Sequence, residues 1–324
     1  MILLTNIVIN LYMQVFSSIK DLTKNKNTIL TLGTFDGIHP GHLKIIDKLV
    51  ECSKDKGCRN VVITFHPHPR TVLGSGGDIK MLTTQDERKN LLEKHGVENF
   101  LTINFTKDFA SLTAEQFIYD YLVNGIGLSE IVLGHDHHFG RGRSGNVELL
   151  KKIGVIENFS VTTVDAFYIN DEVVSSTKIR NALIEGDLKK ANILLGRNYS
   201  FTGTVVGGDK RGRELGFPTA NIKLSSQEKL LPAIGIYAVR VLLGNEAHIG
   251  LLSIGKRPTF YNAGELVTEV YIYNFNREIY DEVVTIELVE RLRGEEKFNS
   301  AEELISQMNK DKENGLKIFN ELNN

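Results

Sequence analysis

The stretch Gly33-Thr34-Phe35-Asp36-Gly37-Ile38-His39-Pro40-Gly41-His42 decides the fold of the first half of the chain. An apolar run over residues 28–32 precedes it, and apolar residues at helical spacing follow it over residues 43–50. We therefore predict a tight turn between a β-strand and an α-helix. Glycine lets the backbone at Gly33 and Gly41 approach a ligand, and Pro40 suits the first position of a helix. Free backbone N–H groups and the helix dipole favour an anion at such a turn.

Two histidines, His39 and His42, stand on either side of Pro40 and Gly41. As N–H donors they can hold the charge that develops on a phosphoryl oxygen during nucleophilic attack. The alternative is a surface turn with two solvated histidines. Because the residue types agree with the position between strand and helix, the pattern favours a phosphate site.

The composition limits the class of protein. The chain has 324 residues, a formal net charge of −2 and two cysteines. Its length favours two domains, and its charge gives no reason to expect a nucleic acid or a membrane surface as partner. Cys52 and Cys58 cannot form a zinc site alone. With few cysteines and no recognisable signal peptide, we expect a cytoplasmic protein.

Strands and helices alternate after the opening turn. Apolar runs over residues 61–65, 100–103 and 131–133 read as strands, and capping boxes over 84–87 and 113–116 read as helix starts. This alternation predicts a mostly parallel, doubly wound sheet. The first of these runs ends in His66-Pro67-His68-Pro69, whose prolines predict an extended loop at the ligand-binding edge of the sheet. A rigid turn without a ligand is the alternative.

Two further segments of this half carry polar groups. The run 131–133 leads into 134–143, which holds three histidines and Asp136, so a metal site is one interpretation. Only alternate residues of an extended segment share a face and no partner ligands are obvious, which argues against it. The segment 173–180 offers Ser175 and Ser176 as helix N-caps, with a helix expected through Glu185. Its hydroxyls and Arg180 predict a second anion site.

The character of the chain changes after a short helix expected over residues 187–195. Glycines become dense, and short β-branched runs replace the helices over 204–206, 234–243, 248–254, 268–275 and 283–289. We predict a small antiparallel β-barrel followed by a terminal helix that starts near Ser300. The expected domains are residues 1–185 and 186–324.

Two features of the second half point to chemistry. Residues 208–221 combine glycine with basic residues, which suits a loop over phosphates or, alternatively, a solvated basic loop. The chain has no P-loop signature. In 268–272, alternation places Glu269 and Tyr271 on one strand face, where Glu269 is either an outward surface carboxylate or a base.

These motifs together resemble the bifunctional riboflavin kinase/FAD synthetase family. The resemblance rests on Phe-Asp-Gly with His-x-Gly-His, on Ser-Ser-Thr-Lys-Ile-Arg over 175–180, and on Gly-Phe-Pro-Thr-Ala-Asn over 216–221, and it covers about residues 13 to 312. It implies a nucleotidylyltransferase domain and a riboflavin kinase barrel, which phosphorylate riboflavin to FMN and adenylylate FMN to FAD. Two positions depart from the family pattern: His137 replaces a usual Phe, and Ser253 a usual Asn.

The resemblance also implies a set of functional residues. The catalytic residues would be His39, His42 and Glu269. The residues that bind ATP or its phosphates would be Gly33, Phe35, Asp36, Gly41, His68, Ser175, Ser176, Thr177, Arg180, Gly208, Arg213, Thr219 and Asn221. The flavin would contact His66, Asp136, Phe139 and Arg291, and Mg²⁺ would be held by Thr219 and Asn221.

The expected partners are therefore small molecules: ATP, riboflavin, FMN and FAD, with Mg²⁺ as cofactor and a monomer or weak oligomer as the working state. Two alternatives stay open. One is a nucleotidylyltransferase with another acceptor, which the first half alone allows. The other is a flavin-binding protein without turnover, for which His137 and Ser253 are the support.

Overall fold

The structure is a computed structural model that describes residues 12–74, 79–208, 216–256 and 266–322. The chain forms two compact units: residues 1–80 with 85–174, and residues 81–84 with 175–324. The domain limits 1–185 and 186–324 remain a prediction. Each unit is described separately below.

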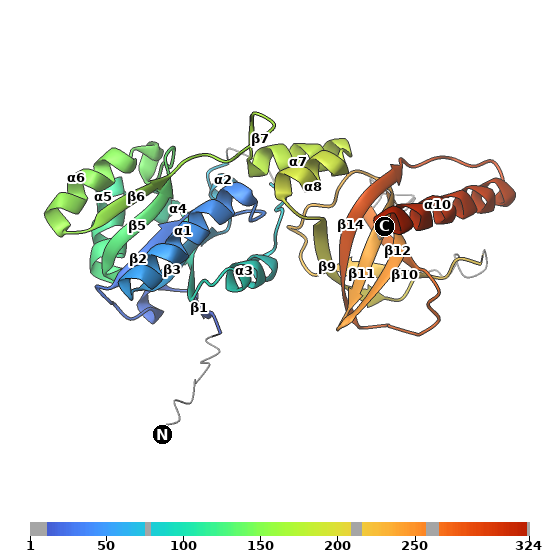
Figure 1. The fold of residues 1–324 in the computed structure, drawn as a ribbon, viewed down its shortest axis with the longest axis horizontal. Helices are drawn as coiled ribbons and strands as arrows, with labels where there is room; N and C mark the ends of the chain where they lie inside the picture. The colour runs from blue at the N-terminus through green and yellow to red at the C-terminus, as the bar shows by residue number, and fades with distance from the viewer. Residues whose placement is uncertain (1–11, 75–78, 209–215, 257–265, 323–324) are drawn as a thin grey trace, which may run out of the picture. The chain divides into compact units, whose positions relative to one another are not determined.

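The first unit is built on a parallel sheet of six strands in the order β1-β4-β3-β2-β5-β6 (Figure 1). Every neighbouring pair in this sheet is parallel. This confirms the predicted doubly wound α/β fold. The strands are β1 (Gln14–Phe16), β2 (Thr28–Leu32), β3 (Arg59–His66), β4 (Asn99–Asn104), β5 (Leu128–Gly134) and β6 (Ser160–Val164).

Helices cover both faces of the sheet. The helix α1 (Pro40–Lys56) and the helix α3 (Gln85–Lys94) pack on one face through Ile46, Leu49 and Leu92. The π-helix η2 (Phe117–Ile126) and the helix α6 (Val147–Glu157) pack on the other face. The short elements are η1 (Ile19–Asp21), α2 (Pro69–Val72), α4 (Lys107–Ala110), α5 (Ala114–Gln116), η3 (Arg141–Arg143), β7 (Tyr168–Ile169) and β8 (Glu172–Val173).

The helix signals in the sequence agree with these elements in part. Thr113 and Gln116 form the predicted capping box, with both hydrogen bonds present. The segment after Pro67 differs from the predicted extended loop. The peptide bond between His66 and Pro67 is cis, and α2 begins at Pro69. Proline is favoured at the first helical position, so the second proline starts a helical turn instead of extending the chain.

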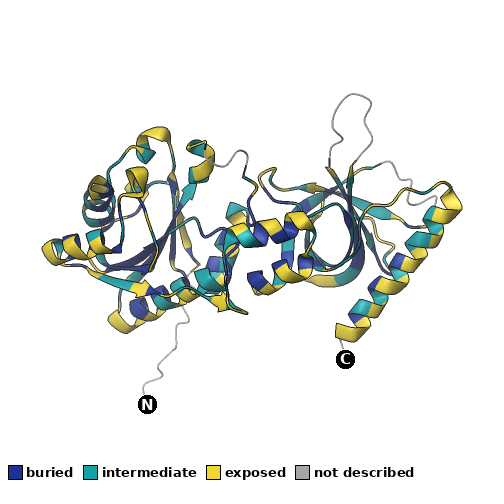
Figure 2. Ribbon diagram, turned by 90° about the horizontal axis from the view of Figure 1, so that it is seen from above, coloured by how far each residue is buried: buried dark blue, intermediate teal, exposed yellow. Residues whose placement is uncertain are grey.

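The second unit contains a closed antiparallel barrel in the order β10-β13-β12-β11-β14-β9. Seen end-on in Figure 2, its strands form a ring, and many of their residues are buried. The helices α7 (Ser176–Glu185) and α8 (Leu188–Leu195) precede the barrel, and α10 (Ala301–Leu322) packs on it. The strands are β9 (Tyr199–Val206), β10 (Thr219–Leu224), β11 (Gly235–Leu243), β12 (Glu246–Lys256), β13 (Leu266–Ile272) and β14 (Val283–Arg293).

The predicted barrel and terminal helix are therefore confirmed. A two-residue hairpin at Gly244 and Asn245 joins β11 to β12, with Leu243 opposite Glu246. The helix α10 is held to the barrel by Arg293, whose Nη2 lies 2.8 Å from Oδ2 of the buried Asp311. This ion pair is largely removed from water, so it fixes where the helix lies.

Residues 81–84 belong to the second unit although the chain on both sides of them belongs to the first. Met81 pairs with Lys229, and the Lys229 ammonium donates a hydrogen bond to the Leu82 carbonyl at 2.7 Å. Lys229 is buried and also lies over the Tyr199 ring, 4.6 Å from its centroid. These contacts satisfy a cation that would be costly to bury alone.

Candidate active sites

The histidine-bearing turn lies at the carboxyl edge of the parallel sheet. It follows β2, and the segment 134–143 follows β5, the neighbour of β2 in the sheet. From β2 the sheet extends to β3 and β4 on one side and to β5 and β6 on the other. Ligands of open α/β sheets bind where the strand order diverges in this way.

The backbone of the turn is strained. Phe35 and Ile38 have φ angles of 46° and 42°, and Gly37 between them has 87°. Positive φ is costly for residues with a side chain, above all for a β-branched one. Phe35 and Ile38 are 3% and 1% exposed, and Asp36 is fully buried. The apolar core below the turn therefore holds the strained backbone in place.

His39 and His42 are stacked. Their ring centroids are 3.6 Å apart with an interplanar angle of 19°, and the edge of the Phe35 ring packs against His42. His39 is the N-cap of α1, and its Nδ1 accepts the backbone N–H of His42 at 3.3 Å. An Nδ1 that accepts a hydrogen bond carries no proton, so the ring proton of His39 is on Nε2, where the ring can act as a donor.

Gly33 and Gly41 stand where a side chain would press on these rings. A Cβ at Gly33 would lie 3.2 Å from the Phe35 ring, and a Cβ at Gly41 would lie 3.2 Å from the His39 ring. Both distances are tighter than ordinary van der Waals contact. The glycines therefore leave room for the rings as well as for a ligand.

The segment after β5 places its side chains in different surroundings. Asp136 is exposed, whereas Phe139 is buried and packs on Phe117 with ring centroids 5.8 Å apart. The Nε2 of His137 is enclosed without a hydrogen-bond partner, and burial lowers the pKa of His137 to about 4. A neutral His137 ring, stacked on Phe139, thus occupies the position of the family's usual Phe as an aromatic group.

The metal interpretation of this segment receives no support. Among the described residues, no group of three or more His, Cys, Asp or Glu side chains could hold a metal ion.

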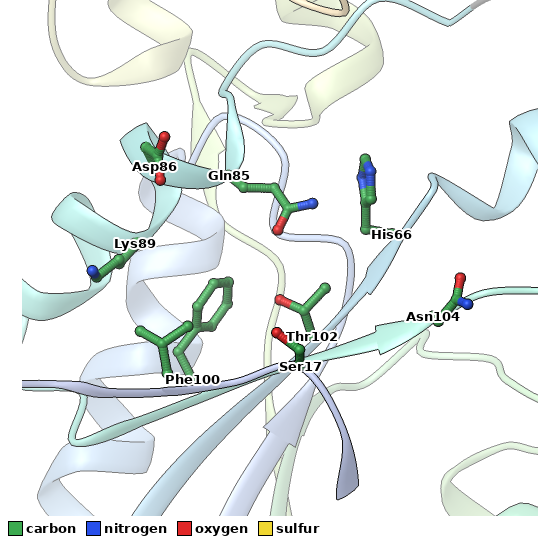
Figure 3. A pocket seen from close by; sticks show the side chains of 9 residues that line it. Ser17, His66, Gln85, Asp86, Lys89, Phe100, Thr102 and Asn104 are labelled. Carbon is green, nitrogen blue, oxygen red and sulfur yellow. The ribbon is translucent and has the colours of Figure 1, made fainter. Parts of the chain in front are cut away.

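His66 lines a pocket on the side of the sheet that faces α3 (Figure 3). Polar side chains from the segment after β1, from α3 and from β4 complete the pocket. His68 is not one of the lining residues; its Nδ1 caps α2 by accepting the N–H of Arg70. The pocket is lined by Val15, Ser17, His66, Gln85, Asp86, Lys89, Phe100, Thr102 and Asn104.

A row of aromatic rings on the opposite face has no counterpart in the sequence predictions. Phe65, at the end of β3, packs against Phe105 and Phe109, with ring centroids 5.7 and 5.9 Å from its own. All three rings are partly exposed. A flat apolar surface at the carboxyl edge suits a planar ligand. The signal available in the sequence was a pair of phenylalanines, Phe105 and Phe109, four residues apart just after a predicted strand.

The predicted second anion site lies at the N-terminus of α7. Ser175 is the N-cap and accepts the N–H of Lys178 at 3.4 Å. Ser176 is partly exposed and Thr177 is exposed, whereas Arg180 is buried, with 9% of its surface exposed. The helix ends at Glu185, as predicted, and Gly186 follows in the left-handed conformation.

In the barrel, the structure brings Thr219, Asn221 and Glu269 together. Asn221 of β10 lies opposite Glu269 of β13, and the Thr219 hydroxyl donates a hydrogen bond to Glu269 Oε2 at 3.2 Å. Ser253 of β12 lies opposite Glu269 on its other side. Directly paired residues of antiparallel strands share a face, so these side chains form one row across three strands. The departure at Ser253 therefore lies beside the predicted base.

Gly208 packs directly on this row. A Cβ at Gly208 would lie only 2.0 Å from the Asn221 side-chain nitrogen, so no other residue fits there without displacing the amide. Beside the row, the Tyr271 ring packs edge-on against Phe217 at 5.6 Å. The predicted phosphate ligand Arg213 lies outside the described residues.

Arg291 contacts the start of β11 and the backbone at Gly186. Its Nη2 donates to the Ile234 carbonyl at 2.9 Å, and its guanidinium packs against Gly186 and Gly235. It also lies beside Tyr237, its neighbour on β11, where burial raises the pKa of the Tyr237 hydroxyl. Its described contacts therefore tie β14 to the start of β11, and its role toward a flavin remains a prediction.

Comparison with known protein families agrees with this division. The FAD synthetase family model matches residues 21–178, and the riboflavin kinase family model matches residues 195–319. The bifunctional riboflavin kinase/FMN adenylyltransferase of Listeria monocytogenes is 39% identical over 91% of this chain and 94% of its own length. The chain belongs to the bifunctional riboflavin kinase/FMN adenylyltransferase family. The predicted two-step synthesis of FAD is thereby confirmed, and a nucleotidylyltransferase with another acceptor is not the function.

Other members of the family show similar agreement. The Bacillus subtilis enzyme is 37% identical over 91% of this chain and 93% of its own length. The Escherichia coli K12 enzyme is 35% identical over 90% and 92%. A crystal structure described as a macrolide-efflux protein from Streptococcus pneumoniae superimposes with a TM-score of 0.84, at 32% identity, and covers 93% of this chain and 98% of that one.

Within the described residues, no helix is both long and apolar enough to cross a bilayer.

Proposed function

We propose that the histidine turn of the first unit catalyses adenylyl transfer to FMN, and that the Thr219–Asn221–Glu269 row of the barrel catalyses phosphoryl transfer to riboflavin. The observation that carries this proposal is that each unit holds its own cluster of groups suited to a phosphate. One cluster is the stacked pair His39 and His42 at a helix N-terminus. The other is the hydrogen-bonded row around Glu269.

In the adenylyl transfer, a phosphate oxygen of FMN bonds to the α-phosphorus of ATP while the bond to pyrophosphate breaks. The Nε2–H of His39 and the ring of His42 donate hydrogen bonds to the phosphoryl oxygens as negative charge moves onto them. The backbone N–H groups at the start of α1 and the close approach at Gly33 and Gly41 support the same charge.

In the phosphoryl transfer, the 5′-hydroxyl oxygen of the ribityl chain bonds to the γ-phosphorus while the bond to ADP breaks. Glu269 orients this hydroxyl and accepts its proton as attack proceeds. Thr219 and Asn221 present oxygen atoms beside this carboxylate, which is the type of ligand that Mg²⁺ prefers. When bound, the ion neutralises charge on the phosphates.

The remaining predicted residues are assigned around these two centres. In the first unit, His66, Asp136 and Phe139 are assigned to the flavin, together with the partly exposed Phe65–Phe105–Phe109 row, on which an isoalloxazine ring can stack. The hydroxyls of Ser175, Ser176 and Thr177, with Arg180, are assigned to the outer phosphates of ATP. Phe35, Asp36 and His68 are assigned to the ATP side, and Gly208 and Arg213 to the second ATP.

The test separates the two reactions in one chain. With riboflavin and MgATP, His39→Ala and His42→Ala accumulate FMN and form no FAD. Glu269→Gln forms no FMN from riboflavin but still converts supplied FMN to FAD. Chromatography of the flavins measures both products. His95→Ala and Glu287→Gln are matched controls in the same two units, since these side chains lie on the surface just after α3 and on β14.

Loss of both reactions in a folded variant would refute the assignment of the sites. If the unaltered protein binds FMN tightly and consumes no ATP, it is a flavin-binding protein without turnover.

A further inference from the structure

The helix α3 buries an arginine. Arg88 is 3% exposed, and it lies on the face of α3 that packs on the sheet. Burying a guanidinium costs free energy unless its N–H groups are hydrogen-bonded. A buried arginine on a surface helix therefore needs a structural or functional reason.

Arg88 is linked to the histidine turn through one buried side chain. Its Nη1 donates to the Thr64 hydroxyl at 3.1 Å, and the Thr64 hydroxyl donates to the Thr34 carbonyl at 3.3 Å. Thr64 is fully buried on β3, on the side that faces α3. Its partner on β4 is Thr102, which appears in Figure 3 below Gln85 of α3.

The acceptor of this chain of hydrogen bonds has a particular position. Thr34 lies between the end of β2 and the strained residues Phe35 to Ile38, just before the two histidines. Its carbonyl is thus a fixed point at the base of the turn. A hydroxyl that accepts from a cation is a stronger donor to its own acceptor, so Arg88 strengthens the bond that Thr64 makes to Thr34.

We propose that Arg88 and Thr64 are positioning residues for adenylyl transfer. They hold the backbone of the turn so that His39 and His42 meet the α-phosphate in the reactive geometry. This inference rests on the proposed role of the two histidines. Small displacements of such groups cost catalytic rate because the donors are aligned with the transition state and not with the substrate alone.

A neighbouring strand supplies a matched control. Thr31 of β2 is also fully buried, but its hydroxyl has no hydrogen-bond partner among the residues that the structure describes. Thr31→Val and Thr64→Val make the same change of a hydroxyl to a methyl group in the core of the same sheet. Only the second removes a link to the turn.

The experiment compares Thr64→Val, Thr64→Ser and Thr31→Val in the full chain. FAD formation from FMN and MgATP is measured for kcat and KM, and FMN formation from riboflavin serves as the internal control. We expect Thr64→Val to lower kcat for FAD formation about tenfold with little change in KM. Thr64→Ser, which keeps the hydroxyl, restores most of this rate, and Thr31→Val and the kinase reaction are unaffected.

Two results would overturn the proposal. One is that Thr64→Val keeps the FAD-forming rate of Thr31→Val, and the other is that Thr64→Ser is as impaired as Thr64→Val. Arg88→Lys and Arg88→Met extend the test, and should Arg88→Met fail to fold, the Thr64 series decides alone. His42→Ala is run in parallel: if it still forms FAD, the site assignment fails, whereas loss of FAD in His42→Ala with a normal Thr64→Val refutes the positioning role only.

Discussion

The two clusters that we propose to bind phosphate are built in opposite ways. The histidine turn takes its groups from ten consecutive residues and holds them by backbone strain, a helix cap and ring stacking. The barrel row takes its groups from three strands that are up to fifty residues apart, and regular strand pairing holds them. We therefore expect the geometry of the turn to be lost when one of its residues shifts. The geometry of the barrel row should be lost when a neighbouring side chain enters its space.

The largest effect is expected where a neighbour intrudes on the barrel row. Gly208→Ala places a Cβ against the Asn221 amide, 2.0 Å from its nitrogen, so the amide must move away from Thr219 and Glu269. We expect FMN formation to fall about a hundredfold, the usual size of losing one aligned polar group in a transition state. Riboflavin phosphorylation by initial rate measures it.

Gly207 is the matched control for this change. A Cβ at Gly207 would have no atom of the described residues within 4 Å, so Gly207→Ala should keep the kinase rate. Equal losses in the two variants would show that the intruding Cβ is not the cause.

A smaller effect is expected at the histidine turn. Gly41→Ala puts a Cβ 3.2 Å from the His39 ring near the start of α1. Alanine favours a helix by about 0.5–1 kcal/mol over glycine, so the melting temperature should hold or rise while FAD formation falls about tenfold. Calorimetry and an FAD assay on one sample give both values. An active, stabilised variant would show that the spacing of the ring and the backbone does not matter.

The smallest effect concerns His137, in the segment that follows β5. Its pKa is lowered to about 4 in the folded state, below the ordinary value of 6.5. Below pH 6.5 the His137 side chain binds a proton in the unfolded chain but stays neutral in the folded chain until about pH 4. The free energy of unfolding therefore falls as the pH drops from 6.5 toward 4. Between pH 8 and pH 6 the loss is about 1 kcal/mol.

His137→Phe removes this loss, because phenylalanine does not titrate. Urea unfolding at pH 8 and pH 6 measures the difference between the two proteins. His138→Gln, at an exposed neighbour, should leave the pH dependence as in the unaltered chain. If the stability of the His137→Phe variant still falls by the same amount, another group is responsible.

The sequence predicted the two architectures because their signals are local. The apolar run 28–32 and the helical spacing over 43–50 gave a strand and a helix with Pro40 at its first position, and these are β2 and α1. Glycine turns and β-branched runs gave the barrel. The strand β10 was not predicted, although Ala220, Ile222 and Leu224 alternate with polar residues along it. Its partners in the sheet, β9 and β13, are set by the fold and not by this local pattern.

The same limit applies to the sites. The prediction that His39 contacts a phosphate came from its motif, whereas its role as helix cap, and hence the position of its proton, depends on side-chain geometry. In the sequence, nothing distinguishes Arg88 from the other charged residues of its helix. Its burial and its link to Thr64 arise only when α3 packs on the sheet. The row of Phe65, Phe105 and Phe109 likewise requires the folded edge of β3 and β4.

The segment 81–84 has a consequence for the preparation of separate fragments of the protein. The chain passes between its two compact units three times, after residues 80, 84 and 174. A fragment that begins at residue 186 keeps Lys229 and Tyr199 but lacks the carbonyl of Leu82, to which the buried ammonium donates. A single scission therefore leaves all six strands of the barrel but removes one acceptor of a buried cation, so the fragment should be less stable unless the lysine is exchanged for an apolar residue.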